Sequence, residues 1–331
     1  MGRRRRGPSW DGVLVVDKPH GPTSHDVVQS VRRAAGQSRV GHTGTLDPGA
    51  TGVLVLCLGR AAKLVQYLQA GTKTYAARMV LGVETDSQDA QGEVVAERDA
   101  SGVDEHRLCE VLTALQGEIE QLPPMVSAVR VDGRRLHEAA RAGEEVERET
   151  RQVVVHDLVL EDFVPGERAE ASFLVTCSAG TYVRTLAHDA GRALGVGGSL
   201  LSLRRVANGP FTETEAHDLD AIADAGERGE LQTLTLSPIE AVRRALPVEV
   251  VEDPDLARRL AQGGGLPARG RPGNFAVVHE GLLLGIYRDA GDRARPDLVW
   301  TRPEELAAVE GGQVPPAQEE ARSARTRGQG S

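Results

Sequence analysis

The sequence predicts an α+β fold. Segments with strand periodicity come first, helical segments follow, and strand-like segments return near the C-terminus, whereas a doubly wound parallel sheet would alternate strands with helices. No internal repeat with a period typical of solenoids is visible. The chain has 331 residues, of which 40% are hydrophobic, and this is enough for two domains that each bury a core.

Apolar runs and turn residues define the elements of the N-terminal part. Thr23 or Ser24 can cap a helix that ends at Gly36, because the valines and alanines between them share one helical face. The other elements predicted before residue 90 are three strands and one short helix, at 12–18, 53–58, 73–83 and, for the helix, 61–68.

The central part contains one segment that differs from its neighbours. Arginines and acidic residues interleave there with few apolar positions, so we expect a projecting, largely solvated insertion at 125–151. The elements around it follow ordinary strand and helix patterns: helices at 108–115 and 182–194, strands at 153–164 and 169–177, and a helical region at 220–246.

Shifts in composition divide the chain into four parts. A basic arm at 1–9 precedes a larger domain at 10–246, and a run of short strands with glycine-rich turns forms a small β-rich domain at 247–305. Residues 306–331 have few groups to bury, so a disordered tail is expected. The arginines of the arm form either a phosphate-seeking segment or a solubilising tail.

The net charge of −9 would by itself disfavour a nucleic-acid partner, but the charge is uneven. Residues 1–83 carry a net charge of +8 and the remainder −17. Halves of opposite sign are a hint of a face that binds a polyanion. The whole-chain charge therefore does not exclude RNA.

Other classes of protein find no support in the sequence. The three cysteines are far apart and the nine histidines show no metal-ligand spacing, so no metal site is expected and a reducing cytoplasm fits. The basic N-terminus lacks the apolar segment of a signal peptide, and no stretch is long enough for a membrane span.

The loop at 41–52 (GHTGTLDPGATG) is the most informative stretch. Its four glycines permit a close approach by a ligand, and Pro48 restricts the backbone of the single carboxylate, Asp47. Such an Asp in a basic segment is expected to stay ionised, so it can act as nucleophile or base. A simple Asp-Pro-Gly turn is the alternative from spacing alone. A phosphate-binding P-loop is excluded because no GK[ST] follows.

Motifs along residues 10–210 resemble those of the TruB family of tRNA pseudouridine synthases. The resemblance rests on five stretches in family order: VDKPHGPTSHDVV, GHTGTLDPGATGVLVLCLGRAAK, KTYAARMVLGVETDSQD, LPPMVSAVRVDGRRLHEAAR and GTYVRTLAHDAGRALGVGGSLLSLRR. It implies a pseudouridine-synthase fold, with a central mixed, mostly antiparallel sheet flanked by helices. The insertion at 125–151 then matches an RNA-gripping thumb, and 247–305 matches a small PUA-like RNA-binding domain.

The resemblance also implies roles for single residues. Asp47 stands at the catalytic aspartate, which is described as attacking ribose C1′, attacking uracil C6 or removing a C2′ proton. Arg184 stands at the arginine that pairs with this aspartate, and Tyr75 at the tyrosine that stacks on the target base. Tyr182 and Leu203 match further positions of the pocket wall.

RNA contacts are implied at His42 and Lys18, and at Arg130 and Arg134 in the insertion. Lys18 can alternatively support the active-site loop. The chain departs from the family pattern at two positions of the insertion, where Val126 and His137 replace tyrosines that are common in the family. This departure concerns thumb packing and RNA contacts rather than the chemistry.

The function implied is that of a cytoplasmic tRNA pseudouridine-55 synthase. Such an enzyme flips the T-loop uridine out of its stack, binds the T-arm of tRNA and needs no cofactor, metal or protein partner. We expect a monomer. Two alternatives stay open at this point: a non-catalytic RNA-binding module or tRNA-folding chaperone, and a related synthase that acts on a different RNA.

Overall fold

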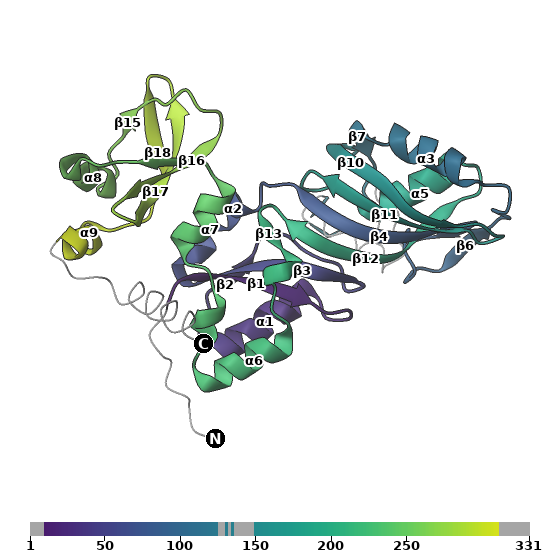
Figure 1. Cartoon of the computed structure of the whole chain (residues 1–331), viewed down its shortest axis with the longest axis horizontal. Helices are drawn as coiled ribbons and strands as arrows, with labels where there is room; N and C mark the ends of the chain where they lie inside the picture. Colours follow the sequence, from purple (N-terminus) through teal and green to yellow (C-terminus); the bar gives the residue numbers. More distant parts are fainter. Residues whose placement is uncertain (1–9, 125–129, 132–133, 136–148, 311–331) are drawn as a thin grey trace, which may run out of the picture.

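The computed structural model of this chain describes residues 10–124, 130–131, 134–135 and 149–310. Two sheets organise these residues: a large mixed sheet that helices flank, and a smaller curled sheet near the C-terminus (Figure 1). The α+β prediction is confirmed, as is the mostly antiparallel character of the large sheet. No helix among the described residues is both long and apolar enough to cross a membrane.

The large sheet has the strand order β1-β3-β12-β4-β11-β10-β7, with β2 paired to β3 and β13 paired to β12. All its pairs are antiparallel except β3 with β12, where Leu203 lies opposite Ala50. The strands are β1 Gly12–Lys18, β2 Val40–His42, β3 Ala50–Leu58, β4 Lys73–Leu81, β7 Gly117–Gln121, β10 Arg151–Val164, β11 Glu170–Cys177, β12 Gly198–Asn208 and β13 Phe211–Thr212.

Helices flank both halves of this sheet (Figure 1). Of the two N-cap residues that the sequence offers, Thr23 caps α1, where it forms a capping box with Asp26, and the predicted end at Gly36 is confirmed in a left-handed conformation. The helices and 3₁₀ turns (η) are α1 Ser24–Ala35, η1 Gly59–Leu64, α2 Val65–Leu68, α3 Glu105–Ala114, α5 Val183–Ala193, η2 Glu213–Glu215, α6 Leu219–Arg228, η3 Leu231–Leu234 and α7 Pro238–Ala245.

Two short hairpins complete this part of the chain. The acidic, turn-rich piece after β4 forms the pair β5 Val83–Thr85 and β6 Val94–Glu97. Within the expected insertion, β8 Arg130–Val131 pairs with β9 Arg134–Arg135. The rest of the insertion up to residue 148 lies outside the described residues, as do Val126 and His137.

Strands β1 and β3 are buried on both faces, and this explains why 53–58 is apolar at every position. Alternate residues of β3 enter two different cores. Leu54, Leu56 and Leu58 pack with α1, whereas Val53 and Val55 pack on the opposite face with α7 and part of the C-terminal sheet. The strand that follows the glycine-rich loop is therefore fixed from both sides.

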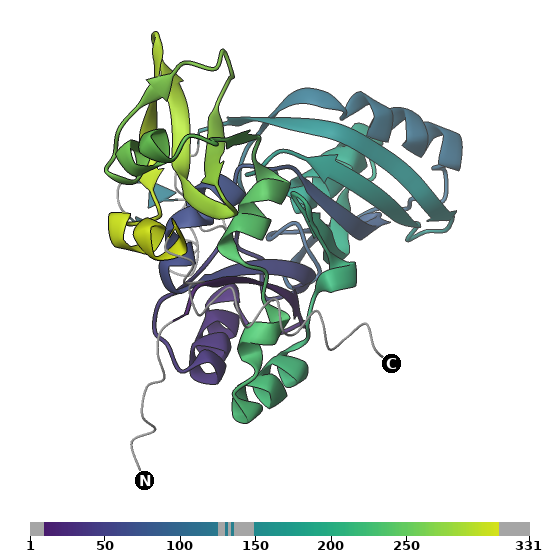
Figure 2. The ribbon, with the colours of Figure 1, turned by 60° about the vertical axis from the view of Figure 1, so that its left-hand side comes forward.

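The C-terminal sheet has the order β14-β16-β17-β18-β15 and buries its own core around Phe275 and Tyr287. Three of its residues, Ala276, Leu283 and Ile286, instead join the core beneath β3. Both views place α7 between the two sheets (Figures 1 and 2). The elements are β14 Val248–Val250, α8 Pro254–Ala261, β15 Leu266–Pro267, β16 Asn274–His279, β17 Leu282–Ala290, β18 Arg293–Val299 and α9 Pro303–Glu310.

The predicted start of the disordered tail was wrong. Residues 303–310 form α9, and Leu306 is 1% exposed within the core of the C-terminal domain. Most residues of this segment are acidic or small, so its composition does not indicate a buried helix. Tertiary packing nevertheless buries Leu306. The basic arm at 1–9 and residues 311–331 lie outside the described residues.

Candidate active site

The loop that carries Asp47 connects β2 to β3 and is held mainly by its backbone. The hydroxyl of Ser24, the first residue of α1, donates to the Leu46 carbonyl at 2.9 Å and accepts from the Leu46 N–H at 2.8 Å. The Ala50 N–H donates to the Asp47 carbonyl at 3.0 Å, which closes the Asp-Pro-Gly turn. The Asp-Pro-Gly turn is therefore present, and it does not compete with a functional role of Asp47 because it orients the carboxylate.

The side chain of Lys18 holds this loop by hydrogen bonds to its backbone. Its ammonium donates to the carbonyls of Pro19, Pro48 and Ala50 at 2.9, 3.3 and 2.7 Å, and the residue is 0% exposed. Burial lowers the pKa of Lys18 to about 8, and the nearby Asp47 opposes that shift. Because all three N–H donors have partners in a buried position, the expected RNA contact of Lys18 does not fit the structure, and loop support does.

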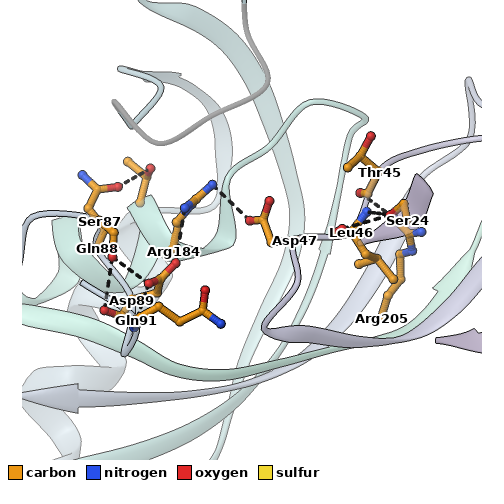
Figure 3. A network of polar contacts seen from close by, with 11 residues as sticks. Ser24, Thr45, Leu46, Asp47, Ser87, Gln88, Asp89, Gln91, Arg184 and Arg205 are labelled. Atoms are coloured by element: carbon orange, nitrogen blue, oxygen red, sulfur yellow. Dashed lines mark hydrogen bonds and ion pairs between the residues drawn. The ribbon is translucent and has the colours of Figure 1, made fainter. Parts of the chain in front are cut away.

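Arg184 brings two carboxylates together. Its Nη2 lies 3.0 Å from Oδ2 of Asp47, and its Nη1 lies 3.3 Å from Oδ2 of Asp89 (Figure 3). The Arg184 side chain is 6% exposed, whereas that of Asp47 is 53% exposed. The aspartate is thus oriented by a buried guanidinium from one side and open to an incoming group from the other.

A cavity of about 540 Å³ adjoins this ion pair. It brings together five residues expected at the site, Asp47, Tyr75, Tyr182, Arg184 and Leu203. Its wall combines aromatic and aliphatic side chains with the backbone of the glycine-rich loop, a combination that suits a flat, polar-edged ligand.

The two tyrosines are held by different means. Tyr75, on β4, is 7% exposed, and burial raises the pKa of its phenol, so it stays neutral. Tyr182 caps α5, and the buried Gln121 fixes its backbone by accepting from its N–H at 2.9 Å and donating to its carbonyl at 3.2 Å. The Arg184 guanidinium lies 5.8 Å from the centre of the Tyr182 ring, a cation–π contact.

The remaining expected residues lie elsewhere. His42 is half-buried beside the loop, where its Nδ1 accepts from the Gly44 N–H at 3.3 Å, and burial lowers its pKa. It is absent from the cavity lining. Arg130 and Arg134 lie opposite Arg135 and Val131 in the β8–β9 hairpin. RNA contacts by these three residues stay predictions.

Three charged residues of the cavity were missed in the sequence. Asp89 belongs to the turn-rich piece after β4, where Ser87 donates to its Oδ1 at 2.6 Å. Lys73 begins β4, and Arg205, on β12, follows the cavity residue Leu203 by two positions. The sequence offers only weak signals for them, namely a polar residue in a turn and a basic residue within a strand.

An accessible, oriented carboxylate beside an aromatic pocket is the arrangement expected of an enzyme site. The family comparisons specify the class. The model of the TruB family pseudouridylate synthase N-terminal domain matches residues 32–183, and that of the tRNA pseudouridylate synthase B C-terminal domain matches 184–245. The chain belongs to the TruB family of pseudouridine synthases, isomerases that act on RNA.

Individual relatives agree with this assignment. A protein of Symbiobacterium thermophilum named tRNA pseudouridine synthase B is 52% identical over 70% of this chain and 81% of its own length. One of the same name from Corynebacterium aurimucosum is 45% identical over 85% of this chain and 93% of its own length. Among solved structures, a chain of a Cbf5-Nop10-Gar1 complex aligns with a TM-score of 0.69 and 26% identity, covering 89% of this chain and 86% of its own.

Proposed function

We propose that this protein is a tRNA pseudouridine synthase that converts the T-loop uridine at position 55 to pseudouridine. The observation that carries the proposal is the Asp47–Arg184 ion pair at the wall of an aromatic cavity. The names of the relatives, tRNA pseudouridine synthase B, support tRNA as the substrate. The motifs quoted above support the position within the tRNA.

In this proposal the target uridine leaves its stack to reach Asp47, because the carboxylate cannot reach a stacked nucleotide. Tyr75 replaces part of the lost stacking, which is worth roughly 1–3 kcal/mol per base. Tyr182 and Leu203 complete the pocket around the base. Arg184 balances the charge of the carboxylate and keeps it oriented while the pocket loses water.

The reaction exchanges one glycosidic bond for another. The bond from C1′ to uracil N1 breaks, the uracil turns, and C5 bonds to C1′ while the C5 proton is lost and N1 gains a proton. Asp47 serves this exchange by attack on C1′, by attack on C6 or by removal of a C2′ proton, and its open face suits all three. The balance is an isomerisation, which needs no cofactor or metal.

Other parts of the chain supply RNA affinity in this proposal. The insertion at 125–151 grips the T-arm, the PUA-like domain contacts the acceptor end, and the protein acts as a monomer. The arm at 1–9 adds phosphate contacts, so binding should weaken with salt.

The test is the Asp47→Asn variant with an unmodified tRNA transcript. Pseudouridine has the mass of uridine, so the product is detected by chemical labelling of pseudouridine followed by sequencing. We expect tRNA affinity and melting temperature near those of the wild type and no pseudouridine at position 55. Asp224→Asn, an exposed position of α6, is the matched control. Turnover near the wild-type rate in Asp47→Asn would refute the proposal.

A further inference from the structure

Two buried cations line the same cavity as Asp47. Lys73, at the start of β4, is 5% exposed, and Arg205, on β12, is 1% exposed. A Cβ atom built on Gly44 would lie 3.7 Å from Nη1 of Arg205 and 3.7 Å from Cε of Lys73, so both side chains lie beside the glycine-rich loop.

Both cations are hydrogen-bonded to carbonyl groups rather than to carboxylates. Lys73 donates to the carbonyls of Gln69 at 3.0 Å and Gly71 at 2.8 Å. Arg205 donates to three carbonyls, of Val53, Gly44 and Thr45, at 2.7, 3.1 and 3.4 Å. Within the part of the chain that the structure describes, neither side chain forms a salt bridge. Both side chains have hydrogen-bond acceptors, but neither charge is neutralised by direct contact with an acid among the described residues.

This arrangement costs stability, because burial disfavours charge and the two cations repel each other. The pKa of Lys73 reflects both effects: burial and then the Arg205 guanidinium lower it to about 8, while Cys177 acts in the opposite direction. A buried, uncompensated pair of like charges is retained most readily where it serves a function.

The rest of the cavity does not neutralise the pair. Its two carboxylates, Asp47 and Asp89, are both held by Arg184. The described residues of the lining thus contain three basic side chains against two acids, although the whole chain carries −9. In the view of Figure 3, Asp47 lies between Arg184 on one side and Arg205 on the other. The cavity is suited to a ligand that carries, or develops, negative charge.

An RNA substrate offers two kinds of negative charge, the phosphates and the reacting base. Lys73 and Arg205 are almost fully buried, and a flipped base enters such a pocket while its phosphates stay near the surface. When the C1′–N1 bond breaks, its electron pair stays on the uracil, which becomes an anion with charge shared by N1, O2 and O4. The base is therefore the group that meets these cations.

We propose that Lys73 and Arg205 stabilise the negative charge of the uracil between cleavage of its bond to C1′ and formation of the new bond from C5. The charge disappears when C5 bonds to C1′, the C5 proton leaves and N1 is protonated. This inference rests on the proposed function, since it concerns the same reaction.

The experiment compares Lys73→Met, which keeps the chain length without the charge, with Lys73→Arg, which keeps the charge. Single-turnover rates are measured with saturating protein on a tRNA transcript, with tRNA affinity and melting temperature alongside. We expect Lys73→Met to lose about 100-fold in rate, the typical effect of one electrostatic group, with affinity within two-fold. Lys73→Arg should recover most of that loss. Arg107→Met, at an exposed arginine of α3 outside the quoted motifs, is the control and should match the wild type.

A second substrate separates charge stabilisation from a structural role. Fluorine at C5 withdraws electrons and makes uracil a better leaving group, so cleavage of the C1′–N1 bond in a transcript with 5-fluorouridine depends less on help from the protein. Because C5 then carries no proton to lose, the rate on this RNA is measured as the disappearance of 5-fluorouridine rather than as pseudouridine formed. Relative to the wild type on each substrate, Lys73→Met should therefore lose at least several-fold less rate on the fluorinated RNA. A structural defect would slow both substrates equally.

Arg205→Lys provides an independent variant. It keeps one positive charge and loses the fork that binds three carbonyls, so we expect a lower melting temperature and a rate loss smaller than that of Lys73→Met. Equal losses on both substrates in Lys73→Met, or no loss, would overturn this inference alone. A wild-type protein that forms no pseudouridine in tRNA would overturn the proposed function and this inference with it.

Discussion

Arg184 and Arg60 each bind two carboxylates, and they do so on opposite sides of β3 along the chain. Arg184 binds Asp47 and Asp89 at the cavity before the strand. Arg60 follows the strand, binds Asp11 at 2.7 Å and Glu305 of α9 at 2.8 Å, and lies 5.2 Å from the centre of the Trp300 ring. The first site lies in the candidate active site, and the second joins the two domains.

The two sites differ in how exposed their charged side chains are to water. Arg184 is 6% exposed and its partner Asp47 is 53% exposed, whereas Arg60 and Glu305 are both 33% exposed. At the junction of the two domains, Arg60 and Glu305 keep part of their hydration. Their attraction therefore adds little stability, and their desolvation costs little. At the cavity, the buried cation depends on its carboxylates while Asp47 stays accessible. The comparison separates an ion pair that orients a reactive group from one that fastens two domains.

The largest effect should follow from removing the buried cation. Arg184→Met leaves Asp47 and Asp89 close together without a counter-charge, and breaking a buried pair costs roughly 3–5 kcal/mol. Because Asp47 is half-exposed, we expect a loss of stability in the lower part of this range. The single-turnover rate should fall by about 100-fold, because Asp47 loses the cation that orients it. The tRNA affinity should change little. A rate within a few-fold of the wild type would remove the distinction drawn between the two arginines.

A smaller effect is expected from the second carboxylate of the same site. Asp89→Asn keeps an oxygen that accepts from Arg184 but removes its charge, so Asp47 still has its partner. We expect a rate loss of about 10-fold, roughly 1.4 kcal/mol. Single-turnover rates of both variants at one pH provide the comparison. A loss greater than that of Arg184→Met would mean that Asp89 does more than balance the arginine.

Arg60→Met should change stability rather than activity. Partly exposed ion pairs contribute about 0–1 kcal/mol each, which corresponds to a fall in melting temperature of a few degrees in a chain of this size. Differential scanning calorimetry measures the shift, and pseudouridine formation at 25 °C should stay within two-fold. Arg78→Met, which breaks a more exposed pair with Glu170, is the control and should shift the melting temperature less. Equal shifts in the two variants would contradict a role of Arg60 at the junction.

The last prediction concerns the pH dependence of stability. The folded-state pKa of Lys18 and of Lys73 is about 8 against 10.5 for an unperturbed lysine, so above pH 8 the unfolded chain binds more protons. Stability then rises with pH, by about 1 kcal/mol per lysine at pH 9. Above pH 9 the buried thiols of Cys57 and Cys177, with pKa values of about 12 and 11, act in the opposite direction.

Urea unfolding at pH 7, 8 and 9 checks this expectation. The wild type should gain stability over the last unit, and Lys73→Met should show about half of that gain. A flat profile in the wild type would show that the two lysines keep their protons in the folded state.

The sequence predicted much of the fold because its periodicity is local. The capping box of α1 and the apolar run of β3 are visible in a few consecutive residues. The start of the tail was wrong because α9 depends on the burial of Leu306 by residues far along the chain. Local composition contains no information about such a partner.

The residues of the candidate site also differ in how far the sequence alone can identify them. Asp47 is visible as a single acid in a glycine-rich loop, whereas its partner Arg184 lies 137 positions later and is suggested only by resemblance to a family. Lys73 and Arg205 resemble ordinary basic residues of strands. Only tertiary structure reveals that they are buried without a counter-charge, and this is the property on which the further inference depends.

The burial of β3 on both faces has a consequence for how this enzyme tolerates mutation. A strand with one solvated face shows substitution tolerance that alternates from one residue to the next. Between Val53 and Leu58, every side chain belongs to one of the two cores, and a side chain at Gly52 would collide with the Arg205 backbone. A deep mutational scan should therefore find an unbroken block of intolerant positions directly after the loop that carries Asp47. That block would leave adaptive change to the loops and the RNA-binding parts.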